Sequence, residues 1–115
     1  MKQLQKYFSL NNSIILYVPS TQNVNEAADN AAEVEQVERF FGSTFGGFTT
    51  TEGRGGWVTD AGQLVTEAVV MVKSFCTDDM LQQHLQDVLD LAEKLKQSMS
   101  QEAVSLEVNG TIYFI

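Results

Sequence analysis

The chain contains only one cysteine, one histidine and one proline among its 115 residues. With Cys76 alone, an internal disulfide and a cysteine-based zinc site are excluded. As a catalytic thiol Cys76 would need a base, and His84, eight residues away, is the only histidine. The alternative is a small buried hydrophobe at the end of a strand. No second histidine completes a metal site, so we expect His84 on a helix surface and neither metal nor cofactor.

Long apolar runs are also missing. None approaches the roughly 20 residues that cross a bilayer, and the apolar stretch at 14–18 is too short for the core of a signal peptide. We therefore expect a cytoplasmic location. The length fits one domain over 1–115, in which residues 1–12 form a loosely ordered arm or a frayed helical turn.

Basic residues are scarce, with 7 lysines and arginines against 15 acidic residues and a net charge of −8. Such a chain repels phosphate backbones, which argues against direct nucleic-acid binding and favours a basic protein partner. The alternative is that the acidity only keeps a small protein soluble.

Hydrophobic spacing predicts two strands and two helices with clear patterns. Residues 13–18 and 63–75 are apolar at successive positions, as in strands covered on both faces. Apolar spacings of three and four predict a helix over 25–41, with Asn23 or Asn25 as its N-cap and Gly42 just past its end. A second helix of roughly 20 residues follows Thr77 as its N-cap. Its stripe fits either a helix on a sheet or a coiled coil.

The remaining segments are read from their turn residues. Residues 45–52 read as a strand that Gly53–Gly56 breaks, residues 57–59 resume an extended chain, and 60–62 form a turn. Asn109-Gly110, between two apolar runs, predicts a terminal hairpin.

This order predicts an α+β fold, a ferredoxin-like β-α-β-β-α-β two-layer sandwich with an extra C-terminal strand. The sheet is antiparallel, both helices cover one face, and the first and third strands lie in its middle. The other face would expose an apolar patch formed by one set of strand residues, Ile15, Tyr17, Val65, Val69 and Met71, or by their neighbours of opposite parity. Because monomers rarely tolerate such a patch, we expect a homodimer through the open sheet face.

The run from Gly47 to Ile115 contains GFT, EGRGGW and G-x-L-x-x-E, followed by an apolar strand, a long helix and a strand pair. It resembles a family of small bacterial proteins with a ferredoxin-like fold, through Gly47, Gly53, Trp57, Gly62 and Glu67. The resemblance covers about the last 60% of the chain. It implies the fold and no particular activity.

Two sets of residues are candidates for a site. Gly53–Gly56 is compatible with an anion-binding nest or with a hairpin loop. Glu52, Arg54, Trp57 and Glu67 are candidates to line a ligand pocket. The carboxylates would then act as general acids or bases, or would form ion pairs. The partner-binding candidates are acidic helix residues: Glu26, Asp29, Glu33, Glu35 and Glu38 on the first helix, and Asp78, Asp79, Asp87 and Asp90 on the second.

Three functions compete. The leading hypothesis is a non-enzymatic acidic protein that inhibits a basic nucleic-acid-binding partner, as antirestriction and anti-CRISPR proteins do, with no catalytic residue. The alternative is a dimeric α+β barrel enzyme or small-ligand binder, with a pocket between sheet and helices lined by Trp57, Glu67 and Met71. The third is a purely structural homodimer.

Overall fold

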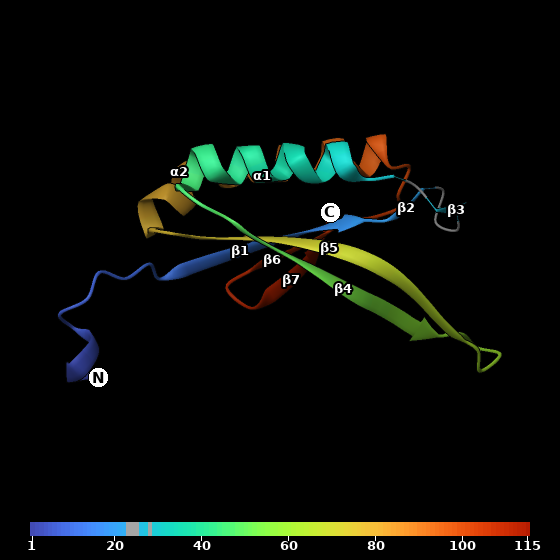
Figure 1. Ribbon diagram of the computed structural model, residues 1–115, viewed down its shortest axis with the longest axis horizontal. Coiled ribbons are helices and arrows are strands. Elements are labelled where there is room, and N and C mark those ends of the chain that lie inside the picture. The colour runs from blue at the N-terminus through green and yellow to red at the C-terminus, as the bar shows by residue number, and fades with distance from the viewer. Residues whose placement is uncertain (23–25, 28) are drawn as a thin grey trace.

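The computed structural model describes residues 1–22, 26–27 and 29–115 of the chain. Five antiparallel strands form one sheet in the order β4-β5-β1-β6-β7, and α1 and α2 both lie on the same face of it (Figure 1). The main elements are β1 (Asn12–Pro19), α1 (Ala31–Phe45), β4 (Thr49–Val58), β5 (Leu64–Cys76), α2 (Asp78–Ser98), β6 (Ser105–Val108) and β7 (Thr111–Phe114). A short 3-10 turn, η1 (Lys2–Leu4), and a two-stranded pair, β2 (Thr21–Gln22) with β3 (Glu26–Ala27), complete the described elements. The predicted ferredoxin-like fold, with β1 and β5 inside the sheet, is confirmed.

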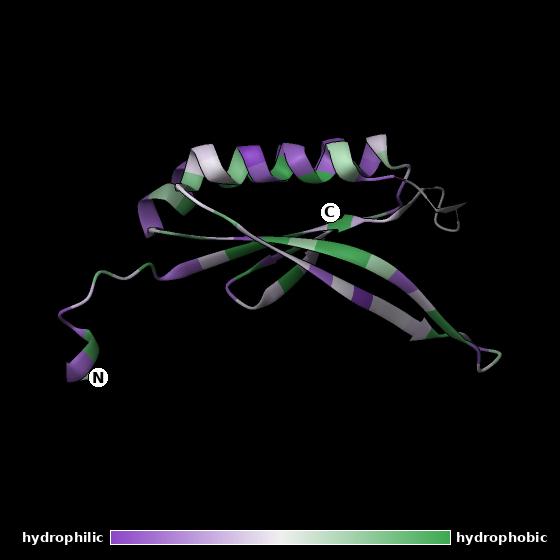
Figure 2. Ribbon diagram, viewed as in Figure 1, coloured by the Kyte–Doolittle hydropathy of each residue, from purple (hydrophilic) through white to green (hydrophobic). Residues whose placement is uncertain are grey.

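The core lies between the helices and the sheet. Alternate residues of β1, Ile14, Leu16 and Val18, are fully buried there, and Phe41 and Leu95 approach them from the two helices. Figure 2 shows hydrophobic residues on the side of α1 that faces the sheet and hydrophilic residues on its outer side. This amphipathic pattern fixes which face of the sheet the helices cover.

The boundaries of α2 follow its sequence signals, whereas those of α1 do not. The Thr77 hydroxyl accepts a hydrogen bond from the Met80 amide at 3.1 Å, which confirms the predicted cap. The predicted start of α1 at residue 25 is wrong, because Glu26 and Ala27 are in β3 and the helix begins at Ala31. The proposed caps Asn23 and Asn25 lie outside the described residues.

The predicted end of α1 at Gly42 is also wrong. The helix continues to Phe45, whose ring packs edge-on against Phe41 with centroids 5.7 Å apart. Gly46 ends the helix at φ 92°, a left-handed angle that glycine adopts without steric cost.

The predicted break at Gly53–Gly56 is wrong. β4 runs unbroken from Thr49 to Val58, and each of its residues pairs with one on β5, including Gly53 with Val69 and Gly55 with Glu67. The long neighbouring strand supplies a continuous ladder of backbone partners, which do not depend on side chains. The glycines therefore lie within a long β4–β5 hairpin.

The two ends of the molecule project from this body. The β4–β5 hairpin extends beyond the helices at one end, and the N-terminal segment extends from the other (Figure 1). The radius of gyration is 15.7 Å, larger than the roughly 13 Å typical of a compact 115-residue domain.

The terminal β6–β7 hairpin turns at Asn109 and Gly110, both at positive φ, as predicted. Among the described helices, none is long and apolar enough to span a membrane.

Candidate functional site

The sheet face that turns away from the helices, here the open face, is the candidate site. Residues directly opposite in an antiparallel pair share a face, and Tyr17 pairs with Met71, which in turn pairs with Thr51. None of these three belongs to the buried core. The same alternation places further residues on this face, namely Ile15, Lys73, Val69, Glu67, Val65, Gly53, Gly55, Trp57, Glu107 and Ile112.

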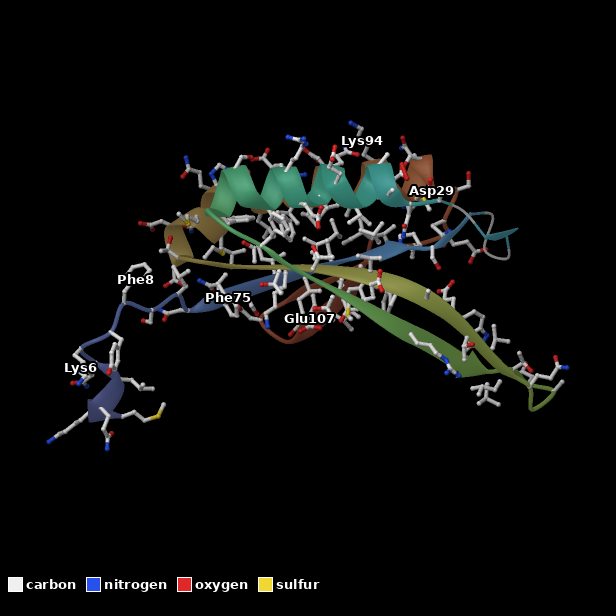
Figure 3. The ribbon with its side chains drawn as sticks, in the orientation of Figure 1. Lys6, Phe8, Asp29, Phe75, Lys94 and Glu107 are labelled. Carbon is white, nitrogen blue, oxygen red and sulfur yellow. The ribbon has the colours of Figure 1, made fainter. Side chains whose placement is uncertain are left out.

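A tyrosine–carboxylate pair lies near the centre of the open face. The Tyr17 hydroxyl donates a hydrogen bond to Oε1 of Glu107 at 3.1 Å. Figure 3 places Glu107 on the side of the sheet away from the helices. Burial raises the pKa of Tyr17, and the hydrogen bond and negative charge of Glu107 raise it further. Tyr17 is therefore a neutral donor at physiological pH, and Glu107 retains lone pairs for another donor.

A second group lies on the same face of the β4–β5 hairpin. Trp57 is opposite Val65 and 47% exposed, and Glu67 is opposite Gly55. A Cβ added at Gly55 would meet nothing within 4 Å, so the backbone beside Glu67 is bare. Tyr17 is opposite Met71, and the four residue steps from Glu67 to Met71, at about 3.3 Å each, place Glu67 roughly 13 Å from Tyr17 along the strand direction.

The four residues of the predicted ligand pocket lie on two faces. Glu52 and Arg54 pair with Val70 and Ala68, which puts them on the opposite face of the hairpin from Trp57 and Glu67. Only the last two are brought together. The enclosed pocket predicted between sheet and helices is wrong, because Trp57, Glu67 and Met71 all lie on the face away from the helices.

The predicted acidic partner-binding residues are spread over the helices, and many have contacts within the chain. Asp29, Asp78 and Asp90 accept hydrogen bonds from Ala31, Asn12 and Gln86 respectively. Glu35 pairs with Arg39 at 3.3 Å, Glu38 accepts from the Thr50 hydroxyl, and Asp87 lies 3.1 Å from His84 Nδ1. Glu33 is half-buried in the first turn of α1, Asp79 is exposed in the first turn of α2, and the backbone of Glu26 lies in β3.

Cys76 and His84 both lie in packed positions on their own elements. Cys76 is fully buried at the end of β5, and burial together with the charge of Asp78 raises its pKa. His84 lies on α2 with its ring edge-on to Phe45. In the described part of the chain, no group of three or more histidine, cysteine or carboxylate side chains could hold a metal ion.

The Tyr17–Glu107 pair was not identified from the sequence. Its members are 90 residues apart, and only the strand register brings them together. The available signal was weak: Tyr17 supplies the one polar group in the side chains of residues 14–18, a run that is otherwise apolar on both faces.

No protein-family model matches this chain, and no curated protein matches it by sequence. Its fold is similar to solved structures of a phage S-adenosylmethionine (SAM) lyase. The complex of that enzyme with S-methyl-5'-thioadenosine is 17% identical, with a TM-score of 0.66 over 97% of this chain and 94% of that one. The apo enzyme is 19% identical, with a TM-score of 0.67 over 96% and 93%. A Bacillus cereus protein related to NIF3 is 15% identical, with a TM-score of 0.52, but this chain spans only 28% of its length.

The leading sequence-based function, a non-enzymatic inhibitor of the antirestriction or anti-CRISPR type, is corrected by these likenesses. Structures that share the fold over nearly the whole of both chains are those of an enzyme that acts on a small molecule. Net acidity had suggested a basic protein partner, but it suits a small cationic ligand equally well.

Proposed function

We propose that this chain binds S-adenosylmethionine on its open face and cleaves it, releasing S-methyl-5'-thioadenosine. One observation carries the proposal. Two carboxylates, Glu67 and Glu107, and two aromatic residues, Trp57 and Tyr17, share the open face of a fold that is also that of a SAM lyase.

The chemistry of the ligand matches these groups. The sulfonium of SAM is a cation without hydrogen-bond donors, so it is stabilised by carboxylates and by aromatic faces. Glu67 supplies a carboxylate and the exposed ring of Trp57 supplies an aromatic face. Gly55, opposite Glu67, has no side chain to obstruct a ligand there. Carboxylates also bind ribose hydroxyls, a role that fits Glu107, whose second oxygen is not used by Tyr17. The net charge of −8 would attract a cationic ligand.

The reaction needs little from the protein beyond binding and positioning. A lyase adds no water, so the substrate's own carboxylate oxygen attacks Cγ of its methionine portion. The O–Cγ bond forms as the S–Cγ bond breaks, and the bonding electrons go to sulfur. The products are a neutral thioether, S-methyl-5'-thioadenosine, and a lactone, and no proton moves. Because the sulfonium charge disappears, an apolar surface shielded from water favours the transition state over the charged substrate.

A second copy of the chain is proposed to provide that shielding. The apolar residues of the open face include Ile15, Met71 and Ile112, the last 45% exposed. An interface of standard size, about 800 Å² per partner, would cover this face and give the ligand its missing walls. We place this activity in the cytoplasm, where SAM is made and used.

Calorimetric titration tests the binding site. We expect Glu107→Gln to weaken binding of S-methyl-5'-thioadenosine about tenfold or more, since it removes a charged acceptor. Glu67→Gln should raise the KM for SAM more than it raises the Kd for the uncharged thioether, because only SAM carries the sulfonium charge. Glu35→Gln, on the exposed side of α1, is the matched control. Absence of thioether binding by folded protein, or equal effects of all three variants, would contradict the assignment.

A further inference from the structure

The N-terminal arm, residues 1–9, projects from the body with its apolar side chains in solvent. Phe8 is 86% exposed, Tyr7 is 60% exposed and Leu4 is 56% exposed. The hydrogen bonds of its first turn, such as Tyr7 N–H to the Leu4 carbonyl at 3.0 Å, remain within the arm. Figure 3 shows Lys6 on the part of the arm far from the sheet and helices, and Phe8 further along the arm toward the body. A segment with this apolar content is more stable packed than exposed.

The arm also differs from the rest of the chain in charge. It contains Lys2 and Lys6, and no acidic residue occurs before Glu26. The remaining chain therefore holds all 15 acidic residues and only 5 basic ones. The arm is basic and apolar, whereas the body is strongly acidic.

An apolar groove on the body has the matching properties. It lies between α2 and the β6–β7 hairpin, has a volume of about 270 Å³, and has walls formed by Leu85, Leu89, Leu106, Val108, Tyr113 and Ile115. Tyr113 and Leu106 are cross-strand partners, so the groove is on the helix side of the sheet, away from the open face. The segment that builds it, residues 77–115, contains seven acidic residues and two lysines.

We propose that the N-terminal arm of one copy binds in this groove of a second copy, with Phe8 inserted between α2 and β7. The arm leaves the body at Asn12, whose side chain donates to Asp78 at the start of α2. Nine residues in extended form span up to about 30 Å, long enough to reach a neighbour's α2. The exposed apolar side chains of the arm match the apolar walls of the groove, and its two lysines are complementary in charge to the acidic segment around the groove, which favours a second copy as the occupant. The inference is independent of the SAM-cleaving activity, and it uses a different surface.

Disulfide trapping between two differently tagged chains tests the contact. A Phe8→Cys chain mixed with a Leu89→Cys chain should form a covalent heterodimer on mild oxidation, because docking would bring the two Cα atoms within disulfide range. Tyr113→Cys, on the opposite wall, is the second partner should Leu89→Cys fail to fold. Phe8→Cys mixed with Glu35→Cys, on the outer side of α1, is the control and should remain uncoupled. The buried Cys76 does not compete.

Sedimentation equilibrium gives an independent readout. Phe8→Ser should weaken self-association about tenfold or more, the effect of losing one buried aromatic side chain. Lys2→Glu with Lys6→Glu should weaken it too, whereas Lys94→Glu, on the outer side of α2, should not (Figure 3). Heterodimer formation no greater than in the control would overturn the proposal. So would an intrachain disulfide in a chain that carries both Phe8→Cys and Leu89→Cys, because it would place the arm in its own groove.

Discussion

At the scale of single residues, Tyr17 is the side chain whose surroundings are most informative. It shares a strand with fully buried residues, yet its hydroxyl reaches Glu107 across the open face. The consequence is a phenol that ionises less readily than in solution, because burial and the nearby carboxylate both disfavour the phenolate.

Stability at alkaline pH should reveal this shift. Above the usual tyrosine pKa of about 10, the unfolded chain ionises Tyr17 while the folded chain resists ionisation. The contribution of Tyr17 to stability is thus complete below pH 10 and is lost as the pH rises through its higher folded-state pKa. Urea titrations from pH 8 to 11 should show a steeper loss for the natural chain than for Tyr17→Phe. Parallel curves for the two proteins would show that the environment of Tyr17 does not disfavour its ionisation.

Cys76 illustrates a buried thiol with a structural role. It is fully buried, and its raised pKa keeps it protonated at neutral pH. A thiol reagent at pH 7.5 should modify it at least tenfold more slowly in the native protein than in 8 M urea. Rapid modification of the native protein would instead identify an accessible, reactive thiol.

At the scale of elements, the β4–β5 hairpin holds half of the candidate site. Its register places Gly55 and Gly56 on opposite faces, although they are neighbours in sequence. A Cβ at Gly56 would lie 2.5 Å from the Val65 carbonyl oxygen, a contact with backbone that side-chain rotation does not relieve. A Cβ at Gly55 would meet nothing.

Alanine substitutions should therefore separate these two glycines. We expect Gly56→Ala to lower the free energy of unfolding by about 1–3 kcal/mol, because the strands must move apart. Gly55→Ala, its matched control, should stay within about 0.5 kcal/mol of the natural chain. Thermal and urea unfolding measure both. Equal stability of the two variants would mean that the hairpin register differs from the one described.

The elements also show where sequence signals were sufficient. Thr77 and the stripe of α2 predicted a helix, and Asn109-Gly110 predicted a hairpin, because each depends on neighbouring residues. The end of α1 depended instead on the packing of Phe45 against Phe41, and β4 continued through its glycines because β5 lay beside it. These outcomes depend on tertiary contacts that local patterns do not contain.

The candidate site was predictable only in part for the same reason. Trp57 and Glu67 were identified from the sequence as unusual residues near one another, and the register places them on one face. Glu52 and Arg54 were grouped with them because spacing alone does not reveal which face of a strand a residue occupies. Glu107 was missed because its partner is distant in the chain.

At the scale of the whole molecule, the shape provides two surfaces for binding, and the charge favours cationic ligands. The body is extended to 52 Å by its hairpin and its arm, and it presents an open sheet face and an apolar groove on different surfaces. Each surface is proposed to receive a second copy or its arm. The acidic charge that first suggested a basic protein partner is instead proposed to draw in a cationic metabolite.

Incubation of the purified chain with SAM tests the central claim most directly. Mass spectrometry of the reaction should show SAM decreasing and S-methyl-5'-thioadenosine accumulating in equal molar amount, at a rate proportional to protein concentration. The rate should fall at least tenfold in Glu107→Gln and remain unchanged in Glu35→Gln. Folded protein that leaves SAM at the level of a protein-free control would contradict the account.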